Sequence, residues 1–264
     1  MSHVPVIESK TNELIKSTKR LQQKKFRDQL GLFFLEGIRI VEESLETPLV
    51  QRIFFTKVLH DDPRGKALLL KAKRQGIEIF ECGEPVFRVL ADTVNSQGVI
   101  AVVKKPTWST IPRGVLLIAD EIQDPGNMGT MLRTATGAGA DGLIIAPGSV
   151  DPYNPKVVRS SMGAILHLPH WSLNHDEIFG LLEKESFKIV VADLVDAVEY
   201  STISYPSNLA VVIGNEARGV SPIFLEKSDL KVYIPLLGPV ESLNASVAAG
   251  ILLYEILRQR RCNN

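Results

Sequence analysis

The second half of the chain consists of continuous apolar runs that alternate with helical stretches, and this pattern limits the fold more than any other feature. The runs are GVLLIAD (114–120), LIIAP (143–147), KIVVAD (188–193), LAVVIGNE (209–216) and a weaker KVYIP (231–235). Strands buried on both faces give such unbroken runs, and alternation with helices is typical of a parallel sheet covered on both sides. We therefore predict an α/β fold whose ligands bind beyond the carboxyl ends of the strands.

The first half has the pattern of a smaller α/β unit. Helical periodicity covers about residues 9–29, and further helical stretches alternate with short apolar runs. The strands expected there are at 33–37, 52–56, 77–81 and 98–103. The segment KKPTWSTIPRG has two prolines and no apolar periodicity, which indicates a linker. We accordingly expect one domain at 1–105, a linker at 106–113 and a second domain at 114–264.

Composition argues against several classes of protein. No apolar run approaches the roughly 18 residues that span a bilayer, and the start of the chain lacks the apolar core of a secretory signal. Cys82 and Cys262 lie far apart without metal-ligand spacing. His167, His170 and His175 surround one predicted strand without an accompanying cysteine or spaced carboxylate, so we expect core or solvated histidines. These features predict a cytoplasmic protein with no metal and no membrane contact.

Charge is distributed unevenly although the formal net charge is +0. Residues 1–113 hold 19 Lys and Arg against 13 Asp and Glu, and residues 114–264 hold 11 against 17, so the halves carry +6 and −6. The positive excess is greatest in a basic cluster of Lys16, Lys19, Arg20, Lys24, Lys25 and Arg27. This cluster is either the solvated face of an amphipathic helix or a surface that meets phosphate.

Gly137, Gly139 and Gly142 form a G-x-G-x-x-G pattern, which suggests a dinucleotide-dependent enzyme. That fingerprint needs a strand before it and a helix after it, so that the pyrophosphate meets the helix N-terminus. Here a helix precedes the glycines and the strand LIIAP follows them. We therefore interpret the three glycines as a helix C-cap and turn.

Polar segments follow three of the predicted strands. After the first strand, DEIQDPGNMGTMLRTATGAGA opens a helix in which Met128, Met131, Leu132 and Ala135 share the apolar face. Arg133 then lies well away from that face. Its guanidinium is either solvated or a fork that binds phosphate.

The two other segments follow later strands. VVIGNEARGVS places Gly214, Asn215 and Glu216 after a buried strand, which suggests backbone close to a ligand. IPLLGPVESLNASVAAG places Ser242 and Asn244 directly before a helix, with Asn244 as a candidate N-cap. Each segment also fits an ordinary strand-to-helix loop or a capped helix, so these residues alone identify no chemistry.

In this order the three segments resemble the signature motifs of the SpoU/TrmH family of SPOUT RNA 2′-O-ribose methyltransferases. The first matches in Asn127 and Arg133 of NMGTMLRTA, and the second in IGNEARGVS with Glu216. The third matches in IPLLGPVESLNASVAAG with Ser242 and Asn244. FFLEGIRIVEESL and NSQGVIAVV are similar to the L30e-like RNA-binding domain that often precedes the family's catalytic domain.

The resemblance implies a trefoil-knotted SPOUT domain at 114–264, an L30e-like substrate-binding domain at 1–105, a homodimer, and S-adenosyl-L-methionine (AdoMet) as methyl donor. The substrate that it implies is structured RNA, ribosomal RNA before transfer RNA. The donor-binding residues that it implies are Leu194, Gly214, Asn215, Ile234 and Leu243. The catalytic residues that it implies are Arg133, Glu216, Asn127, Ser242 and Asn244.

Physical chemistry narrows the role of Arg133 in that reaction. Arginine is effectively always protonated, so it is a poor general base. We hypothesise that Arg133 binds the phosphate beside the target ribose and stabilises developing negative charge, while that phosphate or Glu216 receives the proton. Glu216 could equally orient Arg133, and Asn127, Ser242 and Asn244 would hold the ribose and the loops. The same reaction on transfer RNA and a catalytically silent RNA-binding module are the alternatives.

Overall fold

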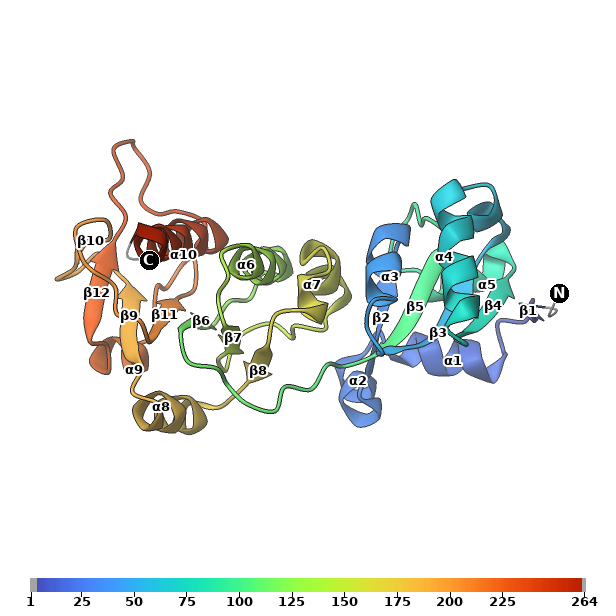
Figure 1. Ribbon diagram of the computed structural model, residues 1–264, viewed down its shortest axis with the longest axis horizontal. Coiled ribbons are helices and arrows are strands. Elements are labelled where there is room, and N and C mark those ends of the chain that lie inside the picture. Colours follow the sequence, from blue (N-terminus) through green and yellow to red (C-terminus); the bar gives the residue numbers. More distant parts are fainter. Residues whose placement is uncertain (1–3, 263–264) are drawn as a thin grey trace. The chain divides into compact units, whose positions relative to one another are not determined.

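The computed structural model describes residues 4–262, and its internal contacts divide the chain into two compact units. The first unit comprises the chain through Thr107 together with Tyr153–Arg159, and the second comprises Trp108–Pro152 together with the chain from Ser160 onward. Figure 1 labels the helices and strands of both units. Each unit is an α/β structure with its own sheet, as the apolar runs predict.

The first unit contains a mixed five-stranded sheet in the order β1-β4-β3-β5-β2. Its strands are β1 (Val6–Ile7), β2 (Leu32–Glu36), β3 (Val50–Phe55), β4 (Glu78–Cys82) and β5 (Val99–Lys104). Its helices are α1 (Glu13–Arg20), α2 (Lys24–Leu30), α3 (Ile38–Ser44), α4 (Pro63–Arg74), α5 (Glu84–Leu90) and the 3-10 turn η1 (Lys57–His60). The helix α7 (Pro155–Ser160) contributes all but its last residue to this unit. β5 runs antiparallel to β2 and β3, whereas β4 is parallel to β1 and β3.

The helical pattern predicted at about 9–29 corresponds to two helices, α1 and α2, with a turn between them. The guanidinium of Arg27 donates through Nη1 to the carbonyls of Leu21 (2.8 Å) and Gln22 (2.9 Å), which holds the turn between the helices. Arg27 is only 3% exposed as a result. It therefore belongs to the structural support of this turn rather than to the solvent-facing part of the basic cluster.

The second unit contains a seven-stranded sheet in the order β10-β12-β9-β11-β6-β7-β8, and every pair in it is parallel. Its strands are β6 (Val115–Ala119), β7 (Gly142–Ile145), β8 (His170–Ser172), β9 (Lys188–Ala192), β10 (Val198–Glu199), β11 (Leu209–Ile213) and β12 (Leu230–Tyr233). Its helices are α6 (Pro125–Gly137), α8 (His175–Lys184), α9 (Pro222–Glu226), α10 (Ala245–Cys262) and the 3-10 turn η2 (Ala164–Leu166). The predicted parallel α/β sheet is thus confirmed.

Helices cover both faces of this sheet. α6 and α10 lie side by side on one face, and α8 and α9 lie on the other (Figure 1). The two helices of the first pair approach closely, since a Cβ on Gly250 would lie 3.4 Å from Cγ2 of Thr134. On the opposite face, Ile178 of α8 and Phe224 of α9 pack on a buried cluster that includes Ile118 and Val212 of the sheet. The sheet therefore has the dry interior that its apolar strands require.

The glycine pattern lies at the end of α6, as a C-cap and turn. α6 ends at Gly137, Gly139 has a left-handed φ of +68°, and the amide of Ala140 donates to the carbonyl of Ala135 at 2.9 Å. β7 then begins at Gly142, so a helix precedes the pattern and a strand follows it. This arrangement confirms the interpretation and leaves no helix N-terminus for a pyrophosphate.

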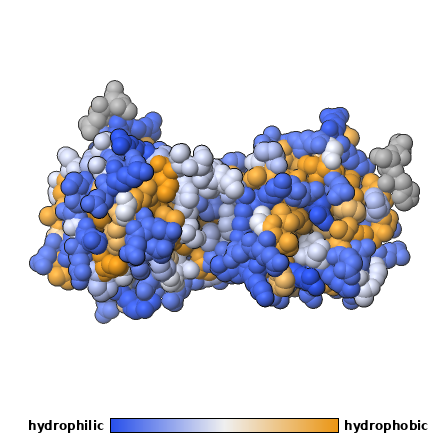
Figure 2. All heavy atoms as spheres, turned by 90° about the horizontal axis from the view of Figure 1, so that it is seen from below, coloured by the Kyte–Doolittle hydropathy of each residue, from blue (hydrophilic) through white to orange (hydrophobic). Residues whose placement is uncertain are grey.

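The surface agrees with the composition. Figure 2 shows a mostly hydrophilic face on which hydrophobic residues form separate patches. Within residues 4–262, no helix is long and apolar enough to cross a membrane. His170 is buried with its Nδ1 2.8 Å from the Leu168 carbonyl oxygen, and its ring packs edge-on against Trp108. His170 is therefore a core histidine.

Replacing Phe224 by alanine tests the packing beneath the sheet. The side chain is fully buried and its ring lies 5.1 Å from that of Phe179, so Phe224→Ala leaves a cavity. We expect a loss of about 3–5 kcal/mol in the free energy of unfolding, measured by urea titration. Leu237→Ala, at a fully exposed side chain, serves as control and should change it by less than about 0.5 kcal/mol. Equal effects of the two substitutions would contradict this packing.

Candidate functional site

The strands of the second unit bring three sequence segments to one edge of the sheet. β6 and β11 are neighbours in parallel register, with Ala119 opposite Ile213, so the loops that follow them start side by side. β9 and β12 pair in the same direction, and their following loops leave at the same edge. Parallel sheets bind ligands at such carboxyl ends. The candidate site is therefore where the sequence pattern predicts it.

Asn127 joins all three segments through its side-chain amide. Its Nδ2 donates to Oε1 of Glu216, which lies 89 residues away in the chain. Its Oδ1 accepts a hydrogen bond from Nδ2 of Asn244 at 2.8 Å, and Asn244 lies 117 residues away. Three polar residues of the three segments thus form one continuous hydrogen-bonded chain, Glu216–Asn127–Asn244.

Helix caps fix the two asparagines in place. Oδ1 of Asp124 accepts from the backbone amide of Asn127 at 2.9 Å, which caps α6. Oδ1 of Asn244 accepts from the backbone amide of Ser246 at 3.0 Å and from its hydroxyl at 2.6 Å. The predicted N-cap at Asn244 is confirmed. The backbone of Asn127 and the side chain of Asn244 are therefore both held at the starts of helices.

Gly214 and Asn215 shape the loop that carries Glu216. A Cβ on Gly214 would lie 2.3 Å from the backbone of Gly219, so no larger residue fits there. Asn215 and Gly219 exchange two backbone hydrogen bonds of 2.9 Å. The side chain of Asn215 accepts from the amide of Ala217 at 2.9 Å and donates to the carbonyl of Glu121 at 3.0 Å. Asn215 thus turns its side chain to the protein's own backbone.

Asp120 and Glu121 support this loop from the end of β6. Asp120 is fully buried, and its Oδ2 accepts from the amide of Ser221 at 2.7 Å. Burial raises the pKa of the Asp120 carboxyl, because the charged form loses its water. Glu121 has a φ of +54° and its carboxylate pairs with Arg218 at 2.7 Å. Sequence reasoning missed both acids, although an Asp-Glu pair directly after a buried strand was the available signal.

Arg133 lies on the exposed face of α6. Met128, Met131, Leu132 and Ala135 are the buried side of that helix, as predicted. Among the residues that the structure describes, the Arg133 guanidinium makes no hydrogen bond or ion pair, and Glu216 is not its partner. An exposed guanidinium with all of its donors unused is available to an external anion.

A cavity of about 130 Å³ lies between the loops after β9 and β12, and its lining residue Leu243 directly precedes Asn244. Leu194, Ile234 and Leu243 line it, as does Ser242. Gly214 and Asn215 do not line it. Three of the five predicted donor-binding residues therefore share one cavity, and the other two support the neighbouring loop.

The walls of the cavity fit the chemistry of AdoMet. The lining is mostly apolar, which suits a flat adenine ring, and it includes the acidic residues Asp193 and Glu241. Carboxylates suit the positive charge of a sulfonium group. Oδ1 of Asp193 also accepts from the amide of Leu194 at 2.7 Å, which orients the backbone at the cavity.

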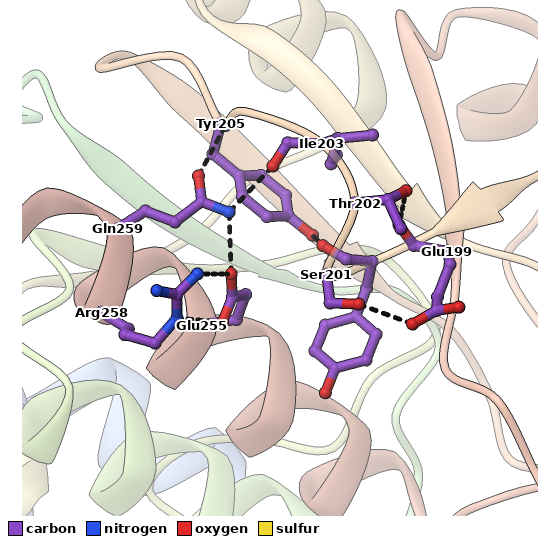
Figure 3. A network of polar contacts seen from close by, with 9 residues as sticks. Glu199, Ser201, Thr202, Ile203, Tyr205, Glu255, Arg258 and Gln259 are labelled. Carbon is purple, nitrogen blue, oxygen red and sulfur yellow. Dashed lines mark hydrogen bonds and ion pairs between the residues drawn. The ribbon is translucent and has the colours of Figure 1, made fainter. Parts of the chain in front are cut away.

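A polar network ties the segment that leaves this cavity to α10 (Figure 3). Nε2 of Gln259 donates to the carbonyl of Ile203 and to Oε1 of Glu255, both at 2.8 Å. Oε1 of Gln259 accepts from the amide of Tyr205 at 3.1 Å, and the Tyr205 hydroxyl donates to the carbonyl of Tyr200 at 2.9 Å. Burial raises the pKa of Tyr205, so this hydroxyl stays protonated and keeps its donor role.

Comparison with known proteins matches each of the two units to a family of protein domains. Residues 114–254 match the model of the SpoU rRNA Methylase family, and residues 12–101 match the MRM3-like substrate binding domain. The chain belongs to the SpoU rRNA methylase family. The resemblance seen in the three sequence segments is thereby confirmed.

Relatives of the family match over both units. The chain is 35% identical to the 23S rRNA (guanosine(2553)-2'-O)-methyltransferase RlmP of Bacillus subtilis, over 95% of this chain and 98% of that protein. It is 30% identical to the mitochondrial rRNA methyltransferase 3 of Xenopus tropicalis, over 98% of this chain and 79% of that protein. The crystal structure of an AdoMet-bound rRNA methyltransferase from Sinorhizobium meliloti matches with a TM-score of 0.85 and 27% identity, covering 97% and 98% of the two chains.

The close approach at Gly214 predicts that alanine destabilises the protein at this position but not in the neighbouring loop at Gly238. Gly214→Ala places a methyl group against the backbone of Gly219, so the loop must move and Glu216 must leave Asn127. We expect the free energy of unfolding to fall by about 1–3 kcal/mol in a urea titration.

Gly238→Ala is the matched control for this substitution. Gly238 has no atom within 4 Å of the added methyl group, and its loop borders the same site. Its stability should equal that of the wild type within about 0.5 kcal/mol. A Gly214→Ala variant as stable as this control would show that the loop tolerates a side chain.

Proposed function

We propose that the protein transfers a methyl group from AdoMet to the 2′-hydroxyl of a ribose in ribosomal RNA. The hydrogen-bonded chain Glu216–Asn127–Asn244 carries this proposal, because it assembles polar groups of three distant segments beside a cavity suited to the donor. Family membership supports the reaction type. The Bacillus subtilis and Xenopus tropicalis relatives match across both units and both are named for rRNA, which favours ribosomal RNA over transfer RNA.

The donor would lie in the cavity lined by Leu194, Ile234 and Leu243. When bound, AdoMet supplies an electrophilic methyl group on a positively charged sulfur. The apolar walls exclude water from that group, and Asp193 and Glu241 provide negative charge near it. The protein's main task is then to hold the ribose oxygen in line with the methyl group, and such positioning supplies much of the rate enhancement.

Arg133 would bind the phosphate beside the target ribose. Its guanidinium is exposed and has no partner among residues 4–262, so all of its donors are available to phosphate oxygens. A guanidinium matches a phosphate through two parallel hydrogen bonds, which fixes orientation as well as position. Its positive charge would also stabilise the negative charge that develops on the ribose oxygen.

Glu216 would accept the proton of the 2′-hydroxyl, in competition with the adjacent RNA phosphate. Asn127 donates to one of its carboxylate oxygens, and within the described chain the second oxygen has no hydrogen-bonding partner. The alternative that Glu216 orients Arg133 receives no support, because within residues 4–262 no hydrogen bond or ion pair joins the two side chains. Asn127 and Asn244 would hold Glu216 in position, and Ser242 would border both donor and ribose.

Each of the two units would have its own function. We propose that residues 1–105 bind the RNA, that 106–113 form a linker and that 114–264 carry out the transfer, in accord with the two family models. In the basic cluster, Lys16 pairs with Glu13 and Lys24 pairs with Asp28. Lys19 and Lys25 have no such pair within the described chain, so they are the members best placed to meet phosphate.

We propose a homodimer formed through α10. Val247 and Tyr254 lie on one side of this helix and are 48% and 51% exposed, with Ile251 between them. An exposed apolar stripe on a helix favours contact with another apolar surface. A trefoil-knotted chain path remains a prediction of the family resemblance, and a cytoplasmic location remains a prediction of the composition. A catalytically silent RNA-binding module is the alternative, and the intact Glu216–Asn127–Asn244 chain argues against it.

Removing the guanidinium of Arg133 tests the proposed reaction. With tritiated AdoMet and deproteinised ribosomal RNA, the wild type should label the RNA at a ribose. Arg133→Ala should reduce kcat about 100-fold or more, because it removes the group that stabilises the developing charge. Its affinity for AdoMet, measured by calorimetry, should stay within about twofold of the wild type, since Arg133 does not line the donor cavity.

Two controls complete this assay. Arg261→Ala removes an exposed arginine at the end of α10 and should leave kcat unchanged. Arg133→Lys keeps the charge but loses the two-pronged geometry, so its kcat should lie between those of Arg133→Ala and the wild type. Normal turnover by Arg133→Ala would remove it from the mechanism. AdoMet binding without transfer to any ribosomal or transfer RNA would favour the silent module.

Charge on the exposed stripe of α10 tests the dimer. The double variant Val247→Asp and Tyr254→Asp should sediment as a monomer, because burying two carboxylates without partners is unfavourable. Val195→Asp places one carboxylate on a side chain that is 63% exposed and outside α10, and it should leave the mass in analytical ultracentrifugation unchanged. A dimer that persists in the double variant would assign the interface to another surface.

A further inference from the structure

The first unit contains a cavity of about 290 Å³ that the proposed methyl transfer does not use. It lies between α5, the end of β3 and the loop 92–98, which we call the cap loop. Pockets that hold small ligands range from roughly 300 to 1,000 Å³, so this one suits a single flat group rather than a large ligand. All of its lining residues belong to the first unit.

The cap loop is held at both ends and free in the middle. At one end, Oε2 of Glu36 accepts from the amide of Asp92 at 2.8 Å. At the other end, Oε1 of Gln97 accepts from the amide of Ile38 at 2.8 Å. Between them, Val94 is fully exposed. This arrangement presents the middle of the loop to solvent on fixed supports, which is typical of a binding loop.

Four polar side chains in the cavity lining have no hydrogen-bonding or ion-pair partner within residues 4–262, and one of them is the acidic Glu84. The hydroxyl of Thr56 is buried without a hydrogen-bonding partner, although the residue is only 1% exposed. The guanidinium of Arg88 and the amide of Asn95 make no hydrogen bond or ion pair within residues 4–262. Buried polar groups are nearly always hydrogen-bonded, so an unsatisfied hydroxyl in a lining that also holds a free amide and a free guanidinium points to a polar ligand.

The pattern of these groups matches a nucleobase. An amide donates and accepts hydrogen bonds on the edge of a base, and a guanidinium stacks on its face or binds the attached phosphate. Val58 and Val94 supply apolar contact at the cavity wall. A second cavity of about 410 Å³ shares Glu84 and Arg88 with the first and adds Lys10, which provides a place for the adjoining backbone.

We propose that the cavity beneath the cap loop binds one unstacked nucleobase of the RNA substrate, with Asn95 on the base edge and Arg88 on its face or phosphate. This inference rests on the proposed function only in taking RNA as the substrate. Proteins recognise RNA sequence mainly through unpaired bases that leave the stack. The first unit would therefore select an unpaired segment of RNA, and not simply attract its charge.

Fluorescence anisotropy with short labelled RNAs tests the cavity directly. The probes are single-stranded 12-mers of A, U and C and a fully paired 12-base-pair RNA duplex, each added to the full-length protein. The wild type should bind at least one single strand about tenfold more tightly than the duplex, because only an unpaired base can enter the cavity. Asn95→Ala and Arg88→Ala should each weaken that binding by about tenfold.

Arg74→Ala is the matched control. Arg74 is an exposed arginine at the end of α4, in the same unit, and it lines neither cavity. It should weaken binding by no more than about twofold, through loss of one charge. Equal effects of Arg88→Ala and Arg74→Ala, with Asn95→Ala unchanged, would reduce the interaction to nonspecific electrostatics and overturn the proposal. Equal affinity for the duplex and every single strand would also overturn it.

Methylation kinetics separate this proposal from the proposed function. With tritiated AdoMet and deproteinised ribosomal RNA, Asn95→Ala should raise the KM for RNA about tenfold and leave kcat unchanged. If the wild type transfers methyl groups and Asn95→Ala has a normal KM, the proposal of a base-binding cavity is wrong and the proposed methyltransferase function stands. Loss of single-strand binding in Asn95→Ala, with no transfer by the wild type to any RNA, would keep the cavity and reject the methyltransferase.

Discussion

β6 and β11 pair in parallel along five residues, from Val115 opposite Leu209 to Ala119 opposite Ile213. This register decides where the two loops begin, and the amide of Asp120 extends it by donating to the Ile213 carbonyl at 2.9 Å. Buried Asp120 then accepts from Ser221 beyond the second loop, which locks the two loops together. A slip of one residue would turn every side chain of a strand to the other face, so Asn127 could no longer meet Glu216. The polar chain of the site thus depends on an apolar pairing.

Much of this architecture could be predicted from local pattern, because an unbroken apolar run between polar segments is typical of a strand buried on both faces. The apolar side of α6 follows from helical spacing alone. The strand order does not, since β9, β11 and β6 are neighbours in an order that differs from the chain order. β8 and β10 have only three and two residues, too few to show a period. The break near Arg27 was missed because its cause is a hydrogen bond of a side chain to carbonyls in the preceding turn.

The sequence could name candidate residues for the site, but it could not show which of them contact one another. Resemblance to a family named the polar residues, and strand ends gave their neighbourhood. That Asn127 stands between Glu216 and Asn244 depends on contacts across 89 and 117 residues, which no local pattern encodes. Nor could spacing show that Asn215 faces its own loop while Leu194, Ile234 and Leu243 share a cavity. From sequence alone, a polar residue in a ligand-binding loop can either hold the loop in place or contact the ligand. Only the fold distinguishes the two.

The network around Gln259 has a consequence for how the protein folds during its synthesis on the ribosome. Gln259 and Glu255 belong to α10, the last helix within residues 4–262, and they hold the segment that follows the cavity residue Leu194. Asn244, which completes the polar chain, stands at the start of the same helix. While α10 is still inside the ribosome's exit tunnel, the rest of the second unit has been made without the residues that complete its site. The nascent chain can therefore complete this site only after α10 has left the tunnel.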